Sequence, residues 1–269
     1  MSRFTMIVAH YLKRATRDLR EIILLLIIPI GLVIFQGMIG GEVEGVSLNG
    51  YNILASHAAP AMLLSFQFFN GFFMFLFLYE DFRGARRWRL LAAPCHVRSF
   101  VFPAFIANWI LSIAIGVVVV IISALFMNVY WGNLLVLAVV IALVSLLSTF
   151  VSMLIFLFTS RKGQANGVGY IISFGLMVLS GFMIPLQLLG DNAVVRFLLN
   201  YGTPLSLGTS AIINSGELSG IFEGMAVFFP GANVGGDGMT QSIQKIGILA
   251  AVTLVFGLVT VIAARRRKI

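Results

Sequence analysis

Charged residues are scarce in this chain. They make up 10% of its 269 residues, against 59% hydrophobic residues, and the mean hydropathy is +1.02. A soluble domain carries about 25% charged residues, and apolar runs of about 18 or more residues, which recur here, are typical of membrane-spanning helices. The ten-residue alternation of barrel strands is missing. The sequence therefore predicts an all-α polytopic membrane protein.

Motifs for metal binding and for ATP binding are also missing. Cys95 is the only cysteine, which excludes an intrachain disulfide and a cysteine-built metal site and indicates a reduced cytoplasmic thiol. His10, His57 and His96 lie far apart, and no H-E-x-x-H motif occurs. No G-x-x-x-x-G-K-[ST] phosphate loop is present, so the chain does not bind ATP in that manner. We therefore expect no catalytic residue, no metal ligand and no enzymatic activity of its own.

Ionisable side chains are absent from the middle of the expected membrane spans. The expected spans are residues 22–39, 59–78, 101–126, 134–158, 167–185 and 246–264. Transporters driven by an ion gradient commonly keep an ionisable group at mid-depth, because a charge in the bilayer is costly and is retained for function. The absence argues against a secondary transporter and against catalysis by carboxylates inside the membrane. Pro29 predicts a kink near the middle of the first span.

The positive charges are distributed unevenly along the chain. The net charge is +8, and six spans with both termini inside place sixteen of the 18 Lys and Arg residues in the cytoplasm, leaving Arg196 and Lys245 outside. Lys and Arg accumulate in short cytoplasmic loops, so this pattern orients the chain in a plasma or inner cell membrane. A nucleic-acid-binding domain would instead spread its basic residues over a folded surface. We expect a lipid membrane as a partner and no nucleic acid.

The N-terminal residues 3–20 have the spacing of an amphipathic helix. Phe4, Ile7 and Tyr11 fall on one face, and basic residues such as Lys13 and Arg17 occupy the rest. Such a helix lies in the membrane interface, with its apolar face toward acyl chains and its basic groups toward anionic headgroups. The alternative is a solvated basic segment whose only role is to orient the chain in the membrane by the positive-inside rule. A cleavable signal peptide is not indicated.

Residues 186–242 form a long segment on the outer side. Residues 194–199 and 204–213 within it are apolar but too short to span, so we expect short re-entrant helices before the last span. No internal repeat divides the chain. We therefore treat residues 1–269 as a single transmembrane domain.

The most charged stretch between two apolar segments is residues 79–98, YEDFRGARRWRLLAAPCHVR. We expect this loop in the cytoplasm, with Glu80 and Asp81 just before a short helix, where acids complement the helix dipole. Arg86, Arg87 and Arg89 would project from that helix as rigid forks suited to carboxylates on a partner. The alternative is that these arginines only satisfy the positive-inside rule.

A family resemblance favours the partner-binding interpretation. It rests on Glu80, Gly84, Arg89-Leu90-Leu91 and Pro94 between the second and third spans, on Gly181 to Pro185 at the end of the fifth span, and on Pro204 before the sixth. With these features the chain resembles the membrane subunits of type-2 (exporter) ABC transporters. Its N-terminal helix is similar to that family's connecting helix. One departure is Arg86-Arg87-Trp88, where family members often have a Thr and an acidic residue.

The resemblance implies a second permease, in a homodimer or heterodimer, and a separate nucleotide-binding ATPase subunit. ATP and Mg would bind that subunit, and none of the chain's own residues would hold a cofactor. Residues 79–98 would be the coupling segment that sits in a groove of the ATPase. The residues implied in this contact are Glu80, Asp81, Gly84, Arg86, Arg87, Arg89, Leu90, Leu91 and Pro94.

Under the same resemblance, the substrate passes along the permease dimer interface, which spans two and five line. The candidate path residues are Gln67, Asn70, Phe73, Met177 and Ser180. Amides within a span usually seek another helix or a cavity, whereas most of the neighbouring phenylalanines are equally well explained by helix packing or lipid contact. An uncharged wall favours a hydrophobic or amphipathic substrate, such as a drug, a peptide or a lipid-linked molecule. The alternatives are a membrane assembly or immunity factor that transports nothing and, less favoured, a secondary transporter.

Overall fold

The chain is mostly helical. The computed structural model describes residues 3–17, 23–42, 47–48, 51–84, 87–88, 98–180, 193–216 and 238–266. The elements in order are α1 (Arg3–Ala15), η1 (Ile23–Ile27), α3 (Ile28–Glu42), β1 (Ser47–Leu48), β2 (Tyr51–Asn52), α4 (Ile53–Phe82), α6 (Arg98–Met127), α7 (Leu134–Phe158), α8 (Lys162–Leu179), α9 (Ala193–Phe197), η3 (Leu198–Gly202), α10 (Pro204–Asn214) and α12 (Gly238–Arg266). The prediction of an all-helical chain therefore needs one small correction, the antiparallel pair β1–β2.

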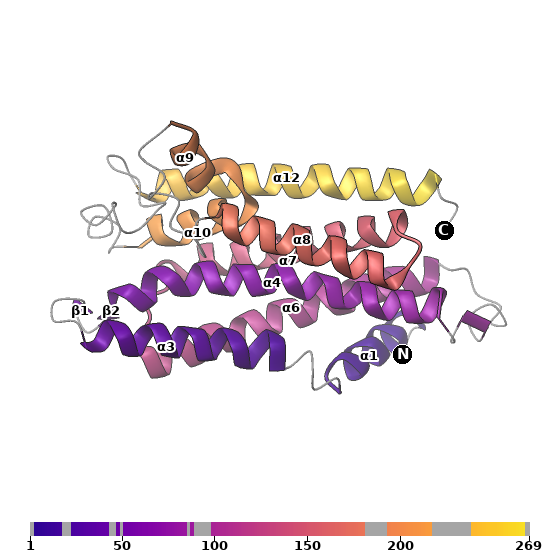
Figure 1. Ribbon diagram of the computed structural model, residues 1–269, viewed down its shortest axis with the longest axis horizontal. Helices are drawn as coiled ribbons and strands as arrows, with labels where there is room; N and C mark the ends of the chain where they lie inside the picture. Colours follow the sequence, from indigo (N-terminus) through magenta and orange to yellow (C-terminus); the bar gives the residue numbers. More distant parts are fainter. Residues whose placement is uncertain are drawn as a thin grey trace.

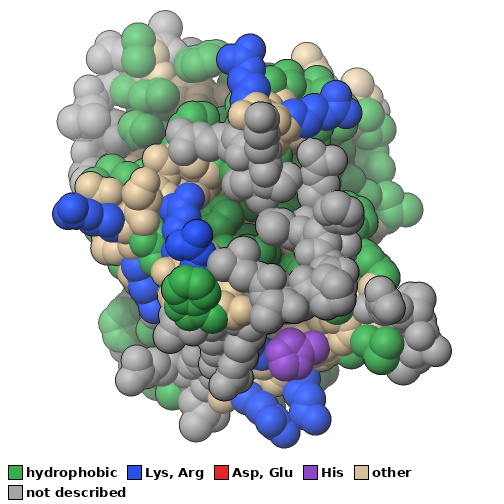
Figure 2. All heavy atoms as spheres, turned by 90° about the vertical axis from the view of Figure 1, so that its right-hand side faces the viewer, with side chains coloured by type: hydrophobic (Ala, Val, Ile, Leu, Met, Phe, Trp, Pro, Cys, Tyr) green, Lys and Arg blue, Asp and Glu red, His purple; other side chains and the backbone are tan. Residues whose placement is uncertain are grey.

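The long helices run side by side along the longest axis of the molecule (Figure 1). Both chain termini and α1 lie toward one end of this bundle, and β1, β2, α9 and α10 lie toward the other. We call these the terminal end and the hairpin end. Lys and Arg side chains are spread over the terminal end, among hydrophobic ones (Figure 2).

Helix α7 forms the centre of the bundle. Among the described residues, three helical segments are long and apolar enough to cross a membrane, namely Phe100–Met127, Leu134–Phe158 and Gly238–Arg266. The most apolar part of the second is 56% buried by other parts of the protein, against 22% for each of the other two. Helix α7 therefore packs against protein along most of its length, whereas α6 and α12 present most of their apolar surface outward.

Asparagines fix the starts of two long helices. The Asn52 side chain accepts a hydrogen bond from the Ala55 amide of α4 at 3.0 Å, and Asn133 accepts one from Leu135 of α7 at 2.9 Å. These contacts satisfy amides that have no partner within the helix. The expected break at Pro29 lies near the start of its helix, where the π-helical turn η1 changes to α-helix at Ile28. Proline lacks the amide hydrogen that the regular hydrogen-bond pattern of an α-helix needs there.

The N-terminal helix α1 packs largely on the protein itself. Tyr11 and Ala15 are buried, Ile7 and Leu12 pack against the core, and the ring of Phe4 lies 5.8 Å from that of Phe102 in α6. The expectation that this apolar face turns to acyl chains is therefore wrong for most of its residues. The sequence pattern predicted which residues share the apolar face of α1, but not that other parts of the protein cover this face. Membrane contact of α1 stays a prediction.

Helix α10 reaches inward from the hairpin end. Thr203 and Ser206 form a reciprocal capping box at its start, and Pro204 occupies its first position. A Cβ placed on Gly208 would lie 2.7 Å from Leu64 and 3.0 Å from Val140, within the length of α4 and α7. The Ile212 carbonyl, by contrast, lies near Gly132 in the turn between α6 and α7. The start of α10 is therefore deeper in the bundle than its end.

The close approach of α4 and α7 depends on Gly71. A Cβ there would overlap the Ser148 hydroxyl and lie 2.6 Å from the Ser148 carbonyl oxygen, a backbone atom that cannot turn away. We expect Gly71→Ala to lower the free energy of unfolding by about 1–3 kcal/mol, because the two helices must separate. Thermal unfolding of the purified protein in detergent measures this.

The matched control is Gly175→Ala in α8, where nothing lies within 4 Å of an added Cβ. Alanine favours a helix over glycine by about 0.5–1 kcal/mol, so this variant should be as stable as the wild type or slightly more so. Equal melting temperatures for the two variants would show that the α4–α7 contact is looser than described.

Candidate functional site

Glu80 and Asp81 lie in the last turn of α4, which ends at Phe82. Residues 87–88 further along are helical, but Glu80 and Asp81 belong to α4, so the expectation that they complement the positive end of a helix dipole is wrong. The C-terminal end of a helix carries partial negative charge, so two acids there are unfavourable by themselves. Cationic partners from other elements must offset this cost.

Those partners come from α1 and α8. The Arg14 guanidinium donates to both Asp81 carboxylate oxygens at 2.9 and 3.0 Å and to Glu80 Oε2 at 2.6 Å. Tyr11 donates its hydroxyl to Asp81 at 2.9 Å, and Lys162 Nζ lies 3.2 Å from Glu80 Oε1. Burial, and secondarily the Asp81 charge, raise the pKa of Tyr11 above its ordinary value, so its hydroxyl stays a donor.

The same turn of α4 is tied to the connection between α7 and α8. Tyr79 donates its hydroxyl to the Ser160 carbonyl, and Arg83 donates to the Thr159 carbonyl. The Arg83 guanidinium also lies 4.9 Å from the centre of the Phe156 ring, within cation–π range. We call this set of contacts the α4 junction, made of Tyr11, Arg14, Tyr79, Glu80, Asp81, Arg83 and Lys162.

Gly84 lies within the predicted coupling segment, residues 79–98, directly after the junction residues of α4. Its amide donates to the Tyr79 carbonyl at 3.0 Å, and a Cβ there would lie 2.6 Å from the Glu80 carbonyl oxygen. Only glycine fits this close turn. Arg87 is exposed, and its amide donates to the Gly84 carbonyl at 3.1 Å. The other expected contact residues lie outside the described residues: Arg86, Arg89, Leu90, Leu91 and Pro94.

Gln67, a candidate path residue, belongs to a polar seam between α4, α6 and α7. Its amide nitrogen donates to the Ser112 carbonyl at 3.2 Å, and its oxygen accepts from the Ser145 hydroxyl at 3.2 Å. Asn108 donates to the Thr149 hydroxyl at 3.2 Å in the same interface. Such hydrogen bonds join helices in an apolar environment. Gln67 therefore has a structural role inside one chain, whatever its part in transport.

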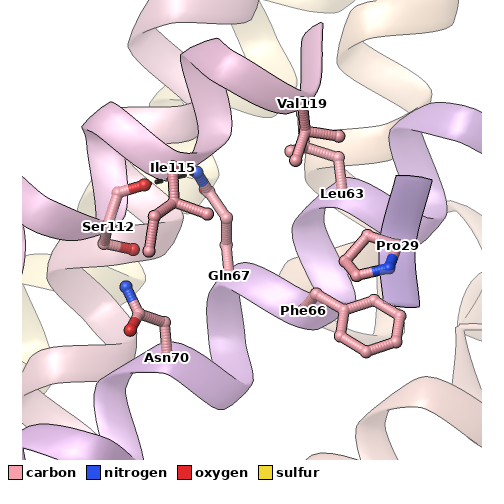
Figure 3. A pocket seen from close by; sticks show the side chains of 8 residues that line it. All are labelled: Pro29, Leu63, Phe66, Gln67, Asn70, Ser112, Ile115 and Val119. Atoms are coloured by element: carbon pink, nitrogen blue, oxygen red, sulfur yellow. Dashed lines mark hydrogen bonds between the residues drawn. The ribbon is translucent and has the colours of Figure 1, made fainter. Parts of the chain in front are cut away.

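Asn70 lies beside this seam, and neither atom of its amide has a hydrogen-bond partner among the described residues, although its exposed fraction is 1%. It lines a small pocket between α3, α4 and α6. Figure 3 shows Asn70 and Ser112 at one side of the pocket, with Pro29 and Phe66 at the other. The structure thus brings Gln67 and Asn70 to one small pocket with mostly apolar walls.

The other candidate path residues do not join this pocket. Met177 is buried at 5% exposure in α8, and the Ser180 hydroxyl donates to the Met177 carbonyl at 2.8 Å. The Phe73 backbone belongs to α4, but its side chain lies outside the described residues. Transport along these five residues stays a prediction.

Sequence reasoning missed several functional candidates. The amphipathic pattern placed Tyr11 on the apolar face but gave no sign that Tyr11 and Arg14 contact Asp81, because these residues are far apart in the sequence. Lys245 was expected outside the last span. The structure instead places it inside α12 with an exposed fraction of 1%. Helix α12 begins eight residues before the expected span, and the apolar count alone gave no sign of that extension.

The comparison with known families decides the class of this protein. The sequence model of the ABC-2 type transporter family matches residues 2–215. The chain belongs to this family. No curated protein and no solved structure matched significantly. The matched range contains the α4 junction, the polar seam and α10, and it ends before α12.

Membership in the ABC-2 family has direct consequences. The domain is a transport permease domain that lacks the ATPase motif, and permeases of this family usually work with an ATPase subunit. No group of three or more His, Cys, Asp or Glu residues that would hold a metal ion occurs in the described part of the chain.

The two acids of the α4 junction should differ in their effect on stability. The Asp81 side chain is only 12% exposed and has two partners, whereas the Glu80 side chain is 44% exposed. We expect Asp81→Asn to lower the free energy of unfolding by about 2 kcal/mol, because it weakens charged hydrogen bonds in a desolvated place. Glu80→Gln should cost less than about 1 kcal/mol, because water screens the pair.

Thermal unfolding followed by tryptophan fluorescence in detergent compares the two variants. Limited proteolysis of α1 provides a local readout, since Asp81→Asn should release this helix first. Equal losses in both variants, or an unchanged α1 in Asp81→Asn, would contradict the assigned role of Asp81.

Proposed function

We propose that this chain is the membrane permease subunit of an ATP-driven ABC exporter that moves a hydrophobic or amphipathic substrate. A separate nucleotide-binding subunit would hydrolyse ATP, and a second permease would complete the transporter. The observation that carries the proposal is the ABC-2 family match together with the α4 junction, from which the predicted coupling segment leaves. Direction and substrate class rest on the resemblance and the uncharged helices.

The arrangement of the helices supports a six-span topology with cytoplasmic termini. The long helices α3, α4, α6, α7, α8 and α12 alternate in direction, and both termini lie toward the same end (Figure 1). That end carries the Lys and Arg side chains that the positive-inside rule assigns to the cytoplasm (Figure 2). The inward course of α10 supports a re-entrant helix from the outer side.

The α4 junction offers a route for transmitting force. A coupling segment that moves with the ATPase would pull on Gly84 and the last turn of α4. That turn is held by α1 through Arg14 and by the α7–α8 connection through Tyr79 and Arg83. Charge-assisted hydrogen bonds are stronger than neutral ones and hold their partners in a defined geometry. A displacement of the loop would therefore move α1, α4 and α8 together.

The lone cysteine allows the topology to be tested. Cys95 lies in the predicted coupling segment, so a membrane-impermeant maleimide should label it in inside-out vesicles but not in intact cells. The matched double variant combines Cys95→Ser with Gly231→Cys in the predicted outer segment, and its labelling should be reversed. Labelling of Cys95 in intact cells would place the coupling segment outside, where no ATPase is available, and would refute the proposal.

Charge reversal in the coupling segment should uncouple the permease from its ATPase. We expect Arg86→Glu or Arg89→Glu to abolish stimulation of ATP hydrolysis and transport, because a carboxylate partner would then meet a like charge. The control is Arg265→Glu, which makes the same change at an exposed position near the end of α12. Reconstituted vesicles containing the permease and its ATPase provide both readouts.

The same vesicles separate the competing functions. Transport by the wild type should require ATP hydrolysis. Transport driven by an ion gradient without ATP would instead indicate a secondary transporter, and full function with a hydrolysis-deficient ATPase would indicate an assembly or immunity factor. Unchanged ATPase stimulation and transport in both arginine variants would rule out the coupling role of residues 79–98.

A further inference from the structure

Lys245 is a buried cation that the proposed transport mechanism does not use. It lies seven residues after the start of α12 at Gly238, which corresponds to about 10 Å along the helix. Its exposed fraction is 1%, and its Nζ atom has no hydrogen-bond partner among the described residues. An ionisable residue within a membrane helix is a functional candidate by default, because its burial is costly.

Lys245 lies where α12 packs against α10, and among the described residues it has one aromatic contact. The Ser242 hydroxyl donates to the Ala211 carbonyl at 2.8 Å and so holds α12 against α10 one turn before Lys245. Leu249, one turn after it, is buried at 1% exposure. The Lys245 ammonium lies 5.8 Å from the centre of the Tyr201 ring, which belongs to η3 just before α10.

The Tyr201 ring alone does not compensate for the burial of this charge. Removing an ammonium group from water costs several kcal/mol, whereas a desolvated cation–π contact returns about 2 kcal/mol. No carboxylate among the described residues forms an ion pair with Lys245. A bound anion would supply the missing stabilisation.

The aromatic neighbour of Lys245 reaches the surface of the protein. Tyr201 is 37% exposed, and its ring stacks on that of Phe197, with 6.4 Å between the ring centres. Phe197 is itself 59% exposed. A ligand that reaches Lys245 past Tyr201 therefore meets a charged group inside and an apolar surface outside.

We propose that Lys245 and Tyr201 form a binding site for the anionic group, a phosphate or a carboxylate, of an amphipathic molecule held between α10 and α12. The ammonium pairs with the anion, and the apolar part of the molecule lies along Tyr201 and Phe197. The site extends the proposed function, because it predicts that the bound lipid or substrate carries a negative charge. Binding is measured without ATP, so a failure of ATP coupling leaves this inference standing.

The experiment titrates the purified full-length protein, in an uncharged detergent, with phosphatidylglycerol, laurate or inorganic phosphate. Phosphatidylcholine, which has no net charge, is the reference probe. We expect phosphatidylglycerol or laurate to raise the melting temperature of the wild type in a saturable manner. Binding of phosphatidylglycerol alone would identify a lipid headgroup as the source of the anion, and binding of laurate would identify a single-chain amphiphile.

Variants of Lys245 assign the binding to this site. Lys245→Met keeps the length of the side chain without its charge, and the apparent affinity should fall at least about tenfold. Lys245→Arg restores the charge and should restore most of the affinity, which guards against a general folding defect in the methionine variant. The matched control is Lys13→Met at an exposed position of α1, which should retain wild-type affinity.

Several outcomes would overturn the inference. Equal losses in Lys13→Met and Lys245→Met would show only general attraction between the protein and anions. Equally tight binding of inorganic phosphate or phosphatidylcholine would remove the requirement for an anionic amphiphile. If the wild type binds no probe but the Glu217→Gln, Glu223→Gln or Asp237→Asn variant does, then a carboxylate of the chain itself pairs with Lys245 and no external anion is needed.

Discussion

Two carboxylates at the C-terminal end of α4 constrain the terminal end of the bundle. Glu80 and Asp81 lie where the helix dipole disfavours negative charge, and Arg14 of α1 compensates by contacting both. This pairing holds an N-terminal helix against the end of a helix more than sixty residues later in the chain. Lys162 then brings the start of α8 to one of these carboxylates, that of Glu80.

The interior of the bundle is organised by a different interaction. Water is the usual competitor for hydrogen bonds, and it is scarce between membrane helices, so small polar side chains join α4, α6 and α7 directly. The absence of a side chain at Gly71 lets α4 approach the Ser148 backbone, and Gln67 connects the facing helices. The seam fixes the middle of α4 while the α4 junction fixes its end. A helix held at both places transmits a displacement along its length.

The terminal end and the hairpin end of the bundle differ in where their basic side chains lie. Basic residues are plentiful at the terminal end, where a headgroup region or a partner protein would receive them (Figure 2). Toward the hairpin end, Lys245 is buried against Tyr201 instead. We infer from this placement that Lys245 gives this part of the helix bundle a preference for anions.

Composition and apolar run length determined the helical membrane class, and the bounds of α7 agree with the span expected at residues 134–158. These features follow from local hydropathy, which needs no knowledge of neighbours. Only the tertiary structure decided that Glu80 and Asp81 end a long helix, that α1 turns its apolar face to protein, and that Lys245 is buried. The reason is physical: burial and ion pairing join residues distant in sequence, and hydropathy along one segment does not record which segment packs against it.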